Sequence, residues 1–317
     1  MCPFCFYFCM QIMLKTDMED KKSLAGAWVE AARPRTLPAS VSPVLLGCAL
    51  AYYDGMFDIT PAVLCLLVAL FAQIASNFAN DYFDFKKGAD REDRLGPERA
   101  VAQGWITPKA MLTGTFAMLG LACLSGLLLI CFADWRLIWV GLAIAICVLA
   151  YSAGPFPLAY NGLGDVCVLL FYGVIPVCFT YYIQTLSFSL LSFLLSVALG
   201  LLSVNILIVN NYRDYEQDKA VRKRTTIVLF GRRAGRVFYV LNECMAFLLV
   251  LPLILDAPWW ILFLFGILFA LCFYTTRELF TLEGRALNRT LGHTVRNVFL
   301  FASVLSLLFL YIVGLSN

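Results

Sequence analysis

Two short acidic segments close two long apolar runs of this chain. The first reads Asn-Phe-Ala-Asn-Asp-Tyr-Phe-Asp (77–84), and the second reads Asn-Asn-Tyr-Arg-Asp-Tyr-Glu-Gln-Asp (210–218). On a helix, residues three, four or seven positions apart share one face. Each segment would therefore gather several amide and carboxylate side chains on one face, namely Asn77, Asn80, Asp81 and Asp84, and then Asn210, Asp214 and Asp218.

Neighbouring carboxylates repel each other, so each cluster needs a cation. Oxygen ligands without histidine or cysteine favour Mg²⁺, which commonly takes one or two carboxylates together with substrate phosphates. Two facing clusters could hold two Mg²⁺ ions that bridge a diphosphate. The alternative is that these acids are solvated helix ends, neutralised by nearby lysines and arginines. Because ionisable residues at the edge of a membrane span are commonly functional, the matched pair favours the metal site.

The rest of the chain is strongly apolar. Hydrophobic residues make up 61% of its 317 residues and charged residues 14%, against about 25% charged in soluble domains. The mean hydropathy is +0.81. Apolar runs near the ~20 residues that cross a bilayer recur along the chain, which predicts an all-α, polytopic membrane protein. We expect nine spans, approximately at 37–54, 60–85, 108–132, 136–152, 163–186, 187–212, 235–256, 258–276 and 296–314.

The basic residues fall on one side of these spans. With the N-terminus in the cytoplasm, every lysine and arginine of the 24 except Arg136 lies in a cytoplasmic segment. The positive-inside rule therefore supports the span count and the orientation. It predicts an integral, multi-pass protein of the cytoplasmic (inner) membrane, with its N-terminus and both acidic loops in the cytoplasm and membrane lipid as its surroundings. No nucleic-acid partner is expected, and the oligomeric state is not predicted.

Residues 1–25 form a poorly defined N-terminal segment, and residues 26–317 form one helical domain. The stretch 1–14 is apolar but too short to span a bilayer, and it lacks the basic start and cleavage site of a signal peptide. His293 is the only histidine, which disfavours a His-dependent catalytic triad or a His-rich metal site.

A second set of residues could contact a substrate. Arg33 lies just before the first span, where its charge could point into a cavity or serve ordinary topology. The segment 151–165, Tyr-Ser-Ala-Gly-Pro-Phe-Pro-Leu-Ala-Tyr-Asn-Gly-Leu-Gly-Asp, carries no lysine or arginine, and its glycines and prolines favour a compact turn whose aromatic residues could cover an apolar substrate. Asp165 opens a span, where a helix-capping role competes with catalysis. The candidate substrate-binding residues are Arg33, Asn77, Asn80, Tyr151, Asp165, Asn211 and Lys223.

The paired motifs resemble the UbiA superfamily of intramembrane prenyltransferases, and most closely its 1,4-dihydroxy-2-naphthoate branch. The resemblance covers the chain from about residue 26. It is carried by Asn-Asp-Tyr-Phe-Asp (80–84), Asn-Asn-Tyr-Arg-Asp-Tyr-Glu-Gln-Asp (210–218), Lys-Arg-Thr (223–225) and Ala-Arg-Pro-Arg-Thr-Leu-Pro-Ala (32–39). The stretch Gly-Pro-Phe-Pro-Leu-Ala-Tyr-Asn-Gly-Leu-Gly-Asp (154–165) points to the naphthoate branch.

The resemblance implies nine helices around a central cavity and a set of ligands. Asn80, Asp81 and Asp84 would bind one Mg²⁺, Asp214 and Asp218 the second, and Arg33 and Lys223 would hold diphosphate oxygens. The catalytic carboxylates would then be Asp81, Asp84, Asp214 and Asp218. In the wider superfamily another aspartate follows the first motif, where this chain has Gly88 and then Asp90.

The implied activity is Mg²⁺-dependent transfer of a polyprenyl group from polyprenyl diphosphate to 1,4-dihydroxy-2-naphthoate. Decarboxylation accompanies the transfer and gives demethylmenaquinone, a step of menaquinone biosynthesis. Transfer to 4-hydroxybenzoate, homogentisate or haem stays open. A transporter that uses intramembrane acids is an alternative of another class, but transporters usually place such charges near the membrane midplane. A CDP-alcohol phosphotransferase is disfavoured because its acidic motif is absent from the sequence.

Overall fold

The computed structural model describes residues 23–88 and 94–316, and every regular element within these ranges is helical. The prediction of an all-α protein is confirmed. In chain order the elements are α2 (Leu24–Ala32), η1 (Pro34–Thr36), α3 (Pro38–Tyr53), α4 (Ile59–Lys86), α5 (Pro108–Leu128), η2 (Leu129–Cys131), α6 (Leu137–Ala150), η3 (Leu158–Tyr160), α7 (Gly164–Leu169), η4 (Leu170–Val174), α8 (Ile175–Thr185), α9 (Leu190–Arg213), α10 (Tyr215–Ala220), α11 (Thr226–Leu255), α12 (Trp259–Thr281), η5 (Gly284–Ala286) and α13 (Leu287–Ser316).

The protein is an integral, multi-pass membrane protein, although nine spans are not confirmed. Seven helices among the described residues are long and apolar enough to cross a membrane. Residues 24–36 and α3 form a pair that is bent by 52°, and this pair makes an eighth if it counts as one span. The remaining predicted span is α6, whose 14 residues fall short of the ~20 that a bilayer requires.

The helices pack through close backbone approach as well as through apolar side chains. α9 contacts α7, η4, α8, α11 and α13, while α13 packs along α3. Where η4 crosses α9, a β-carbon on Gly173 would lie 2.5 Å from the Cα of Gly200. Lipid tails are as apolar as the helices, so close packing at small residues stabilises membrane bundles more than hydrophobic burial does. This contact fixes η4, a π-helical turn, against the centre of the bundle.

Side-chain caps set where several helices begin. The hydroxyls of Thr107, Ser189 and Thr225 accept hydrogen bonds from backbone N–H groups in the first turns of α5, α9 and α11. Such caps satisfy donors that a helix start leaves unpaired. The Thr225 cap starts α11 nine residues before the apolar run predicted at 235, and Gly231, with a φ of 85°, kinks the helix between its first turn and that run.

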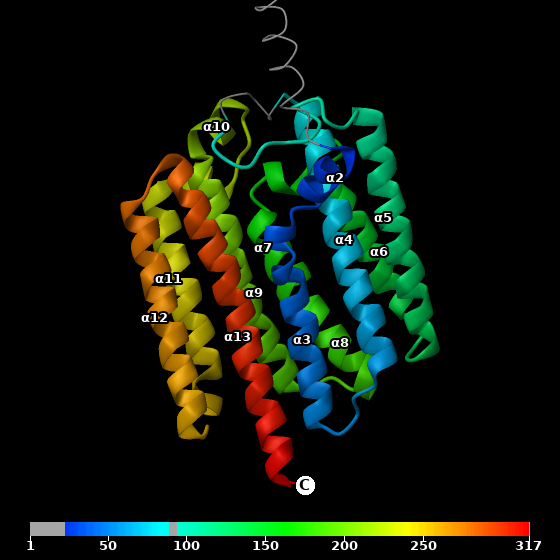
Figure 1. The fold of residues 1–317 in the computed structure, drawn as a ribbon, viewed down its shortest axis with the longest axis vertical. Helices are drawn as coiled ribbons and strands as arrows, with labels where there is room; N and C mark the ends of the chain where they lie inside the picture. The colour runs from blue at the N-terminus through cyan, green and yellow to red at the C-terminus, as the bar shows by residue number, and fades with distance from the viewer. Residues whose placement is uncertain (1–22, 89–93, 317) are drawn as a thin grey trace, which may run out of the picture.

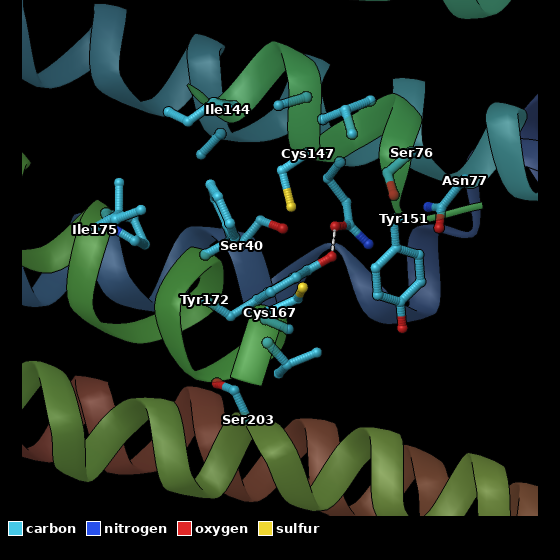
Figure 2. A pocket seen from close by; sticks show the side chains of 18 of the residues that line it. Ser40, Ser76, Asn77, Ile144, Cys147, Tyr151, Cys167, Tyr172, Ile175 and Ser203 are labelled. Carbon is cyan, nitrogen blue, oxygen red and sulfur yellow. Dashed lines mark hydrogen bonds between the residues drawn. The ribbon is translucent and has the colours of Figure 1, made fainter. Parts of the chain in front are cut away.

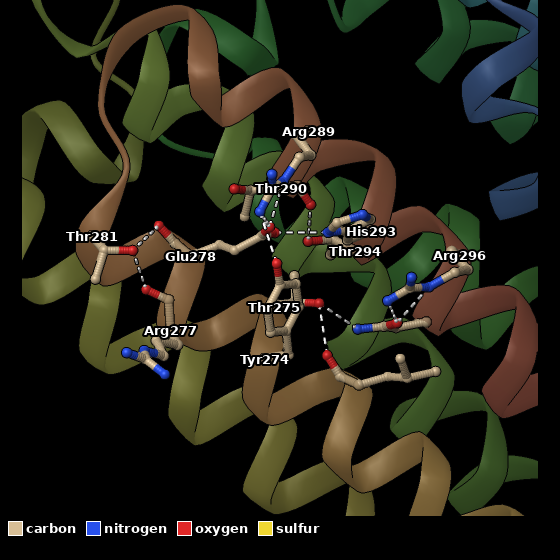
Figure 3. Close-up of polar contacts among 12 residues, drawn as sticks. Tyr274, Thr275, Arg277, Glu278, Thr281, Arg289, Thr290, His293, Thr294 and Arg296 are labelled. Carbon is tan, nitrogen blue, oxygen red and sulfur yellow. Dashed lines mark hydrogen bonds and ion pairs between the residues drawn. The ribbon is translucent and has the colours of Figure 1, made fainter.

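A polar cluster ties α12 to α13 (Figure 3). Glu278 accepts hydrogen bonds from Arg289 Nε at 2.6 Å and pairs with His293 Nδ1 at 2.7 Å. Further along the same helices, Asn297 Nδ2 donates to the Thr275 hydroxyl at 3.0 Å. The single histidine is thus a helix–helix contact between α12 and α13.

The acidic segments lie at one end of the bundle. The short helices α2 and α10 lie at that end, opposite the C-terminus (Figure 1). Because α10 directly follows α9, the second acidic segment is placed there, and α4 ends beside it. Residues 1–22 and Asp90 lie outside the described residues, and the division into a segment 1–25 and a domain 26–317 stays a prediction.

Candidate active site

A cavity of about 560 Å³ runs into the bundle between α3, α4, α5, α6, α7, η4, α8 and α9. Its polar end carries both acidic motifs, and its inner part is lined mainly by apolar residues such as Leu119, Leu129, Ile138 and Phe179. Ten of the predicted site residues line it, namely Arg33, Asn77, Asn80, Asp84, Tyr151, Asp165, Asn211, Asp214, Asp218 and Lys223. The fold therefore brings residues from distant parts of the sequence to one cavity.

The side chains of the first motif point in different directions around α4 and contact different parts of the chain. Asn77 Nδ2 donates to the Ala32 carbonyl at 2.9 Å, which fixes the end of α2 against α4. The Asn80 side-chain oxygen accepts a hydrogen bond from the Ser152 hydroxyl. Asp84 lies 3.9 Å from the Arg99 guanidinium. Asn80 and Asp84 share the face of α4 that lines the cavity.

Asp81, which was predicted as a metal ligand, differs in its contacts from the other acid of its motif; its role as a ligand stays a prediction. Its carboxylate is 2% exposed and accepts the backbone N–H groups of Ala100 at 3.0 Å and Val101 at 3.3 Å. Asp81 is not among the residues that line the cavity. The carboxylate thus holds the loop that carries Arg99 against α4. The difference arises because Asp81 lies at the edge of the face shared by Asn77 and Asp84, where the returning loop reaches it.

Gly88 has a structural reason to depart from the wider superfamily. α4 ends at Lys86, and Gly88 follows with a φ of 68°, in the left-handed region that ends many helices. The position therefore lies beyond the helical face that carries Asn80 and Asp84. A carboxylate there would not continue the spacing of the motif along α4.

The second motif is organised by its own arginine. Arg213 is 1% exposed, and its Nε and Nη2 donate to the two carboxylate oxygens of Asp214, both at 2.7 Å. Arg213 also donates to Asn210 Oδ1 and to Asn288 Oδ1, each at 2.7 Å. The Asn288 amide in turn donates to the Leu95 carbonyl at 2.9 Å. This chain of contacts joins α9, α13 and the loop after α4, and it fixes the orientation of Asp214.

Asp218 and Lys223 form a close pair beside the motif, with Lys223 Nζ 3.3 Å from Asp218 Oδ1. Burial raises the pKa of Asp218 to about 6, with the Lys223 ammonium opposing this rise and the Asp214 carboxylate adding to it. Burial alone would lower the pKa of Lys223, but the carboxylates of Asp218, Asp84 and Asp214 outweigh it and raise that pKa. Lys223 thus couples electrostatically to both acidic motifs.

The remaining predicted residues surround the same cavity. Arg33 adopts the left-handed region with a φ of 54°, at the junction of α2 and η1, which directs the chain from one helix into the next. Strained backbone of this kind often occurs at functional sites. Figure 2 shows Asn77 and Tyr151 at the same side of the cavity. Asp165 and Asn211 lie on α7 and α9, and Asn211 is buried.

Several lining residues were not predicted. Tyr172 on the π-turn η4 donates its hydroxyl to Gln73 of α4 across the cavity (Figure 2). Tyr160 and Ser152 reach the first motif from the segment 151–165. Cytoplasmic loops are usually rich in lysine and arginine, but this predicted cytoplasmic segment has neither. That absence is the sequence signal that could have identified Tyr160.

The arrangement fits a divalent cation. No group of three or more histidine, cysteine, aspartate or glutamate residues that could hold a metal occurs in the described part of the chain. Mg²⁺, however, commonly needs only one or two carboxylates when phosphates complete its shell. Asp218 Oδ2 is buried and has no hydrogen-bond partner among the described residues. A buried carboxylate oxygen without a partner is costly unless a ligand satisfies it, so Asp218, Asp84 and Asn80 could hold Mg²⁺ here.

Comparison with known proteins identifies the family. A model of the UbiA prenyltransferase family matches residues 40–303. The chain belongs to the UbiA prenyltransferase family. The 1,4-dihydroxy-2-naphthoate octaprenyltransferase of Haemophilus influenzae is 39% identical over 220 residues, which cover 67% of this chain and 71% of the relative. The Escherichia coli protein of the same name is 38% identical over 228 residues, 70% of this chain and 74% of the relative.

A solved structure supports the UbiA fold. The structure of a UbiA homolog from Archaeoglobus fulgidus bound to DMAPP and Mg²⁺ has a TM-score of 0.59. At 19% identity, the match covers 86% of this chain and 99% of the other. The predicted resemblance to this superfamily, and to its naphthoate branch, is confirmed.

Proposed function

We propose that this UbiA-family protein transfers a polyprenyl group from polyprenyl diphosphate to 1,4-dihydroxy-2-naphthoate with loss of CO₂. The product is the reduced form of demethylmenaquinone. One observation carries the proposal: a single cavity joins a polar end, where Asp84, Asp218 and Lys223 meet, to an apolar interior. That polarity suits a substrate with a diphosphate head and a hydrocarbon tail. The names of the most similar relatives support naphthoate as the acceptor.

Different residues at the polar end of the cavity would bind the metal ion and the diphosphate. Asn80, Asp84 and Asp218, with Asp214 beside them, would hold Mg²⁺, and Arg33 and Lys223 would contact diphosphate oxygens. Bound Mg²⁺ supplies charge stabilisation to the departing diphosphate. These charges are fixed before the reaction, so they stabilise the negative charge that develops on the leaving group without reorganising. Asp81 acts indirectly in this proposal, by holding the loop that carries Arg99.

The apolar interior would hold the isoprenoid chain and exclude water. The carbon–oxygen bond of the prenyl diphosphate breaks, diphosphate leaves, and the electron-rich naphthoate ring attacks the resulting allylic cation. Loss of CO₂ and a proton from the ring then restores its aromaticity. Water near that cation would compete with the ring, so a water-poor cavity protects the transfer. Tyr151, Asp165, Asn77 and Asn211 line the part of the cavity where the ring could lie.

We also propose that the acidic end of the bundle faces the cytoplasm of a cell with an inner membrane. Within the chain, all basic residues except Arg136 fall in segments assigned to that side. Reporter fusions test the proposal, because a C-terminal fusion should report the side opposite the acidic motifs. A cytoplasmic C-terminus would overturn the orientation.

The decisive test is a transfer assay with purified protein. Labelled polyprenyl diphosphate is incubated with Mg²⁺ and a panel of naphthoate, 4-hydroxybenzoate, homogentisate and haem, and products are identified by mass. We expect a decarboxylated prenyl-naphthalenediol that disappears when EDTA is added. A prenylated product only with another acceptor would overturn the choice of naphthoate, and absence of any transfer would overturn the proposed activity.

A further inference from the structure

The segment 151–165, called here the bridging loop, contacts the first acidic motif and the segment that follows the second. At its start, the Ser152 hydroxyl donates to Asn80 of the first motif. At its middle, the Tyr160 carbonyl accepts the backbone N–H of Arg224 at 3.0 Å, directly after Lys223. The bridging loop therefore connects the first motif to the segment that carries Lys223, although the two are far apart in sequence.

Tyr160 of this loop lines the cavity beside its charged end. Its hydroxyl donates to Asp84 Oδ1 at 2.9 Å. Lys87 Nζ lies 4.1 Å from the centroid of its ring, and Lys223 Nζ lies 5.5 Å from the same centroid. Lys87 Nζ also donates to the Ser152 carbonyl at 2.6 Å. One side chain thus contacts a carboxylate of the first motif and two ammonium groups.

Two ammonium groups that share one ring repel each other, so their closeness needs compensation. The negative face of an aromatic ring attracts cations within about 6 Å. Asp218 pairs with Lys223, and Asp84 lies close enough to oppose the effect of burial on Lys87. An anion with several negative charges is the ligand chemistry that suits two ammonium groups held this way. A diphosphate has that chemistry, and Lys87 is then a second diphosphate partner beside Lys223.

We propose that Tyr160 is a positioning residue for the diphosphate end of the cavity. Its hydroxyl orients Asp84 for a divalent cation, and its ring holds Lys87 and Lys223 where both contact diphosphate oxygens. This inference rests on the proposed function, because it assumes a diphosphate substrate. The hydroxyl and the ring of Tyr160 have separate roles in this inference, and one substitution can remove the hydroxyl alone while another removes the ring as well.

Tyr160→Phe removes the hydroxyl and keeps the ring. Partners that orient a ligating carboxylate typically contribute 10–100-fold to metal affinity, so Mn²⁺ affinity, followed by electron paramagnetic resonance with inorganic diphosphate present, should fall about ten-fold. Tyr53→Phe is the matched control, because Tyr53 is half-exposed at the opposite end of α3. Mn²⁺ affinity of Tyr160→Phe equal to that of the wild type would overturn the role of the hydroxyl.

Tyr160→Leu removes the ring as well. Inorganic diphosphate, titrated by calorimetry at saturating Mg²⁺, should then bind roughly five-fold more weakly than to Tyr160→Phe, because the cation–ring attraction is lost. Equal diphosphate affinity in the two variants would overturn the role of the ring. Thermal unfolding in detergent identifies a misfolded variant. If Tyr160→Leu misfolds, the diphosphate affinity of Lys87→Ala in the wild-type background, compared with that of Lys86→Ala, carries the test.

A double-mutant cycle tests whether the ring acts through Lys87. Lys87→Ala should weaken diphosphate binding roughly five-fold in the wild type, and this loss should shrink in the Tyr160→Leu background, since coupled residues are non-additive. Lys86→Ala, which removes the same charge from the neighbouring exposed residue, is the control and should have little effect. Equal losses from Lys87→Ala in both backgrounds would overturn the inference.

Prenyl transfer by the wild type, measured in parallel, separates the two proposals. If the wild type transfers no prenyl group but the Tyr160 variants lose Mn²⁺ and diphosphate affinity as stated, the proposed function fails and the positioning role stands. If the wild type transfers normally and the variants bind both probes unchanged, the positioning role alone fails.

Discussion

Arg213→Met should destabilise the protein strongly, because Arg213 is the buried partner of Asp214. The substitution removes two charge-assisted hydrogen bonds to Asp214 and one each to Asn210 and Asn288. Asp214 is itself buried, so its charge would lose its compensation. Breaking a buried ion pair by removing one partner costs about 3–5 kcal/mol. For a chain of this size, that corresponds to a fall in Tm of roughly 4–8 °C.

The assay is thermal unfolding in detergent at one scan rate, because unfolding of such proteins is commonly irreversible. Arg136→Met is the matched control: the Arg136 side chain is 77% exposed and lies 3.9 Å from Asp134. An exposed pair of this kind contributes at most about 1 kcal/mol. Adding Asp214→Asn to Arg213→Met should recover part of the lost Tm, because the uncompensated charge is removed. If Arg213→Met lowers Tm no more than Arg136→Met does, the buried pair does not stabilise the fold.

The remaining predictions concern the acidic motifs and the helix packing. Asp218→Asn should reduce prenyl transfer at least 100-fold. Asp81→Asn should lower Tm, because its amide group would face two backbone donors at a cost of about 1–3 kcal/mol; a Tm equal to that of the wild type would contradict this role of Asp81. Gly200→Ala places a methyl group 2.9 Å from a backbone carbonyl and should cost about 1–3 kcal/mol by overpacking. Gly266→Ala, at an open position, is its control in the same unfolding assay, and equal Tm values would refute the packing argument.

The sequence predicted the helices better than their ends. Continuous apolar runs have one solution in a membrane, because each backbone group must be paired within its own helix. The runs therefore gave the order of the helices and placed both acidic segments at one end. The start of α11 was missed, since Gly231, Arg232 and Arg233 interrupt the apolar sequence after the first turn, and the Thr225 cap sets where the helix begins. The predicted span at 136–152 is the 14-residue helix α6, with turns and loop residues on both sides.

The sequence predicted which residues form the candidate site, but it did not predict the contacts that they make. Helical spacing identified the acids and amides of each motif, and ten of the predicted residues line one cavity. Spacing could not show that Asp81 faces the backbone of Ala100 and Val101, because that contact depends on how a distant loop returns to α4. Tyr160 was missed for the same reason: its position depends on the fold of the bridging loop.

The two motifs are alike in sequence but differ in electrostatics. In the second motif, both oxygens of Asp214 accept hydrogen bonds from Arg213, so the motif carries its own compensating charge. Asp218 keeps one buried oxygen with no partner among the described residues, which makes it the stronger candidate ligand of that pair. In the first motif, the compensating charges come from Arg99 in the loop after α4 and from Lys87 at the end of α4, whose ammonium donates to the Ser152 carbonyl of the bridging loop. Two loops therefore hold the charges around the first motif, whereas Asp214 of the second pairs with the adjacent Arg213. We expect substitutions in either loop to weaken cation binding at Asp84 before they affect Asp218.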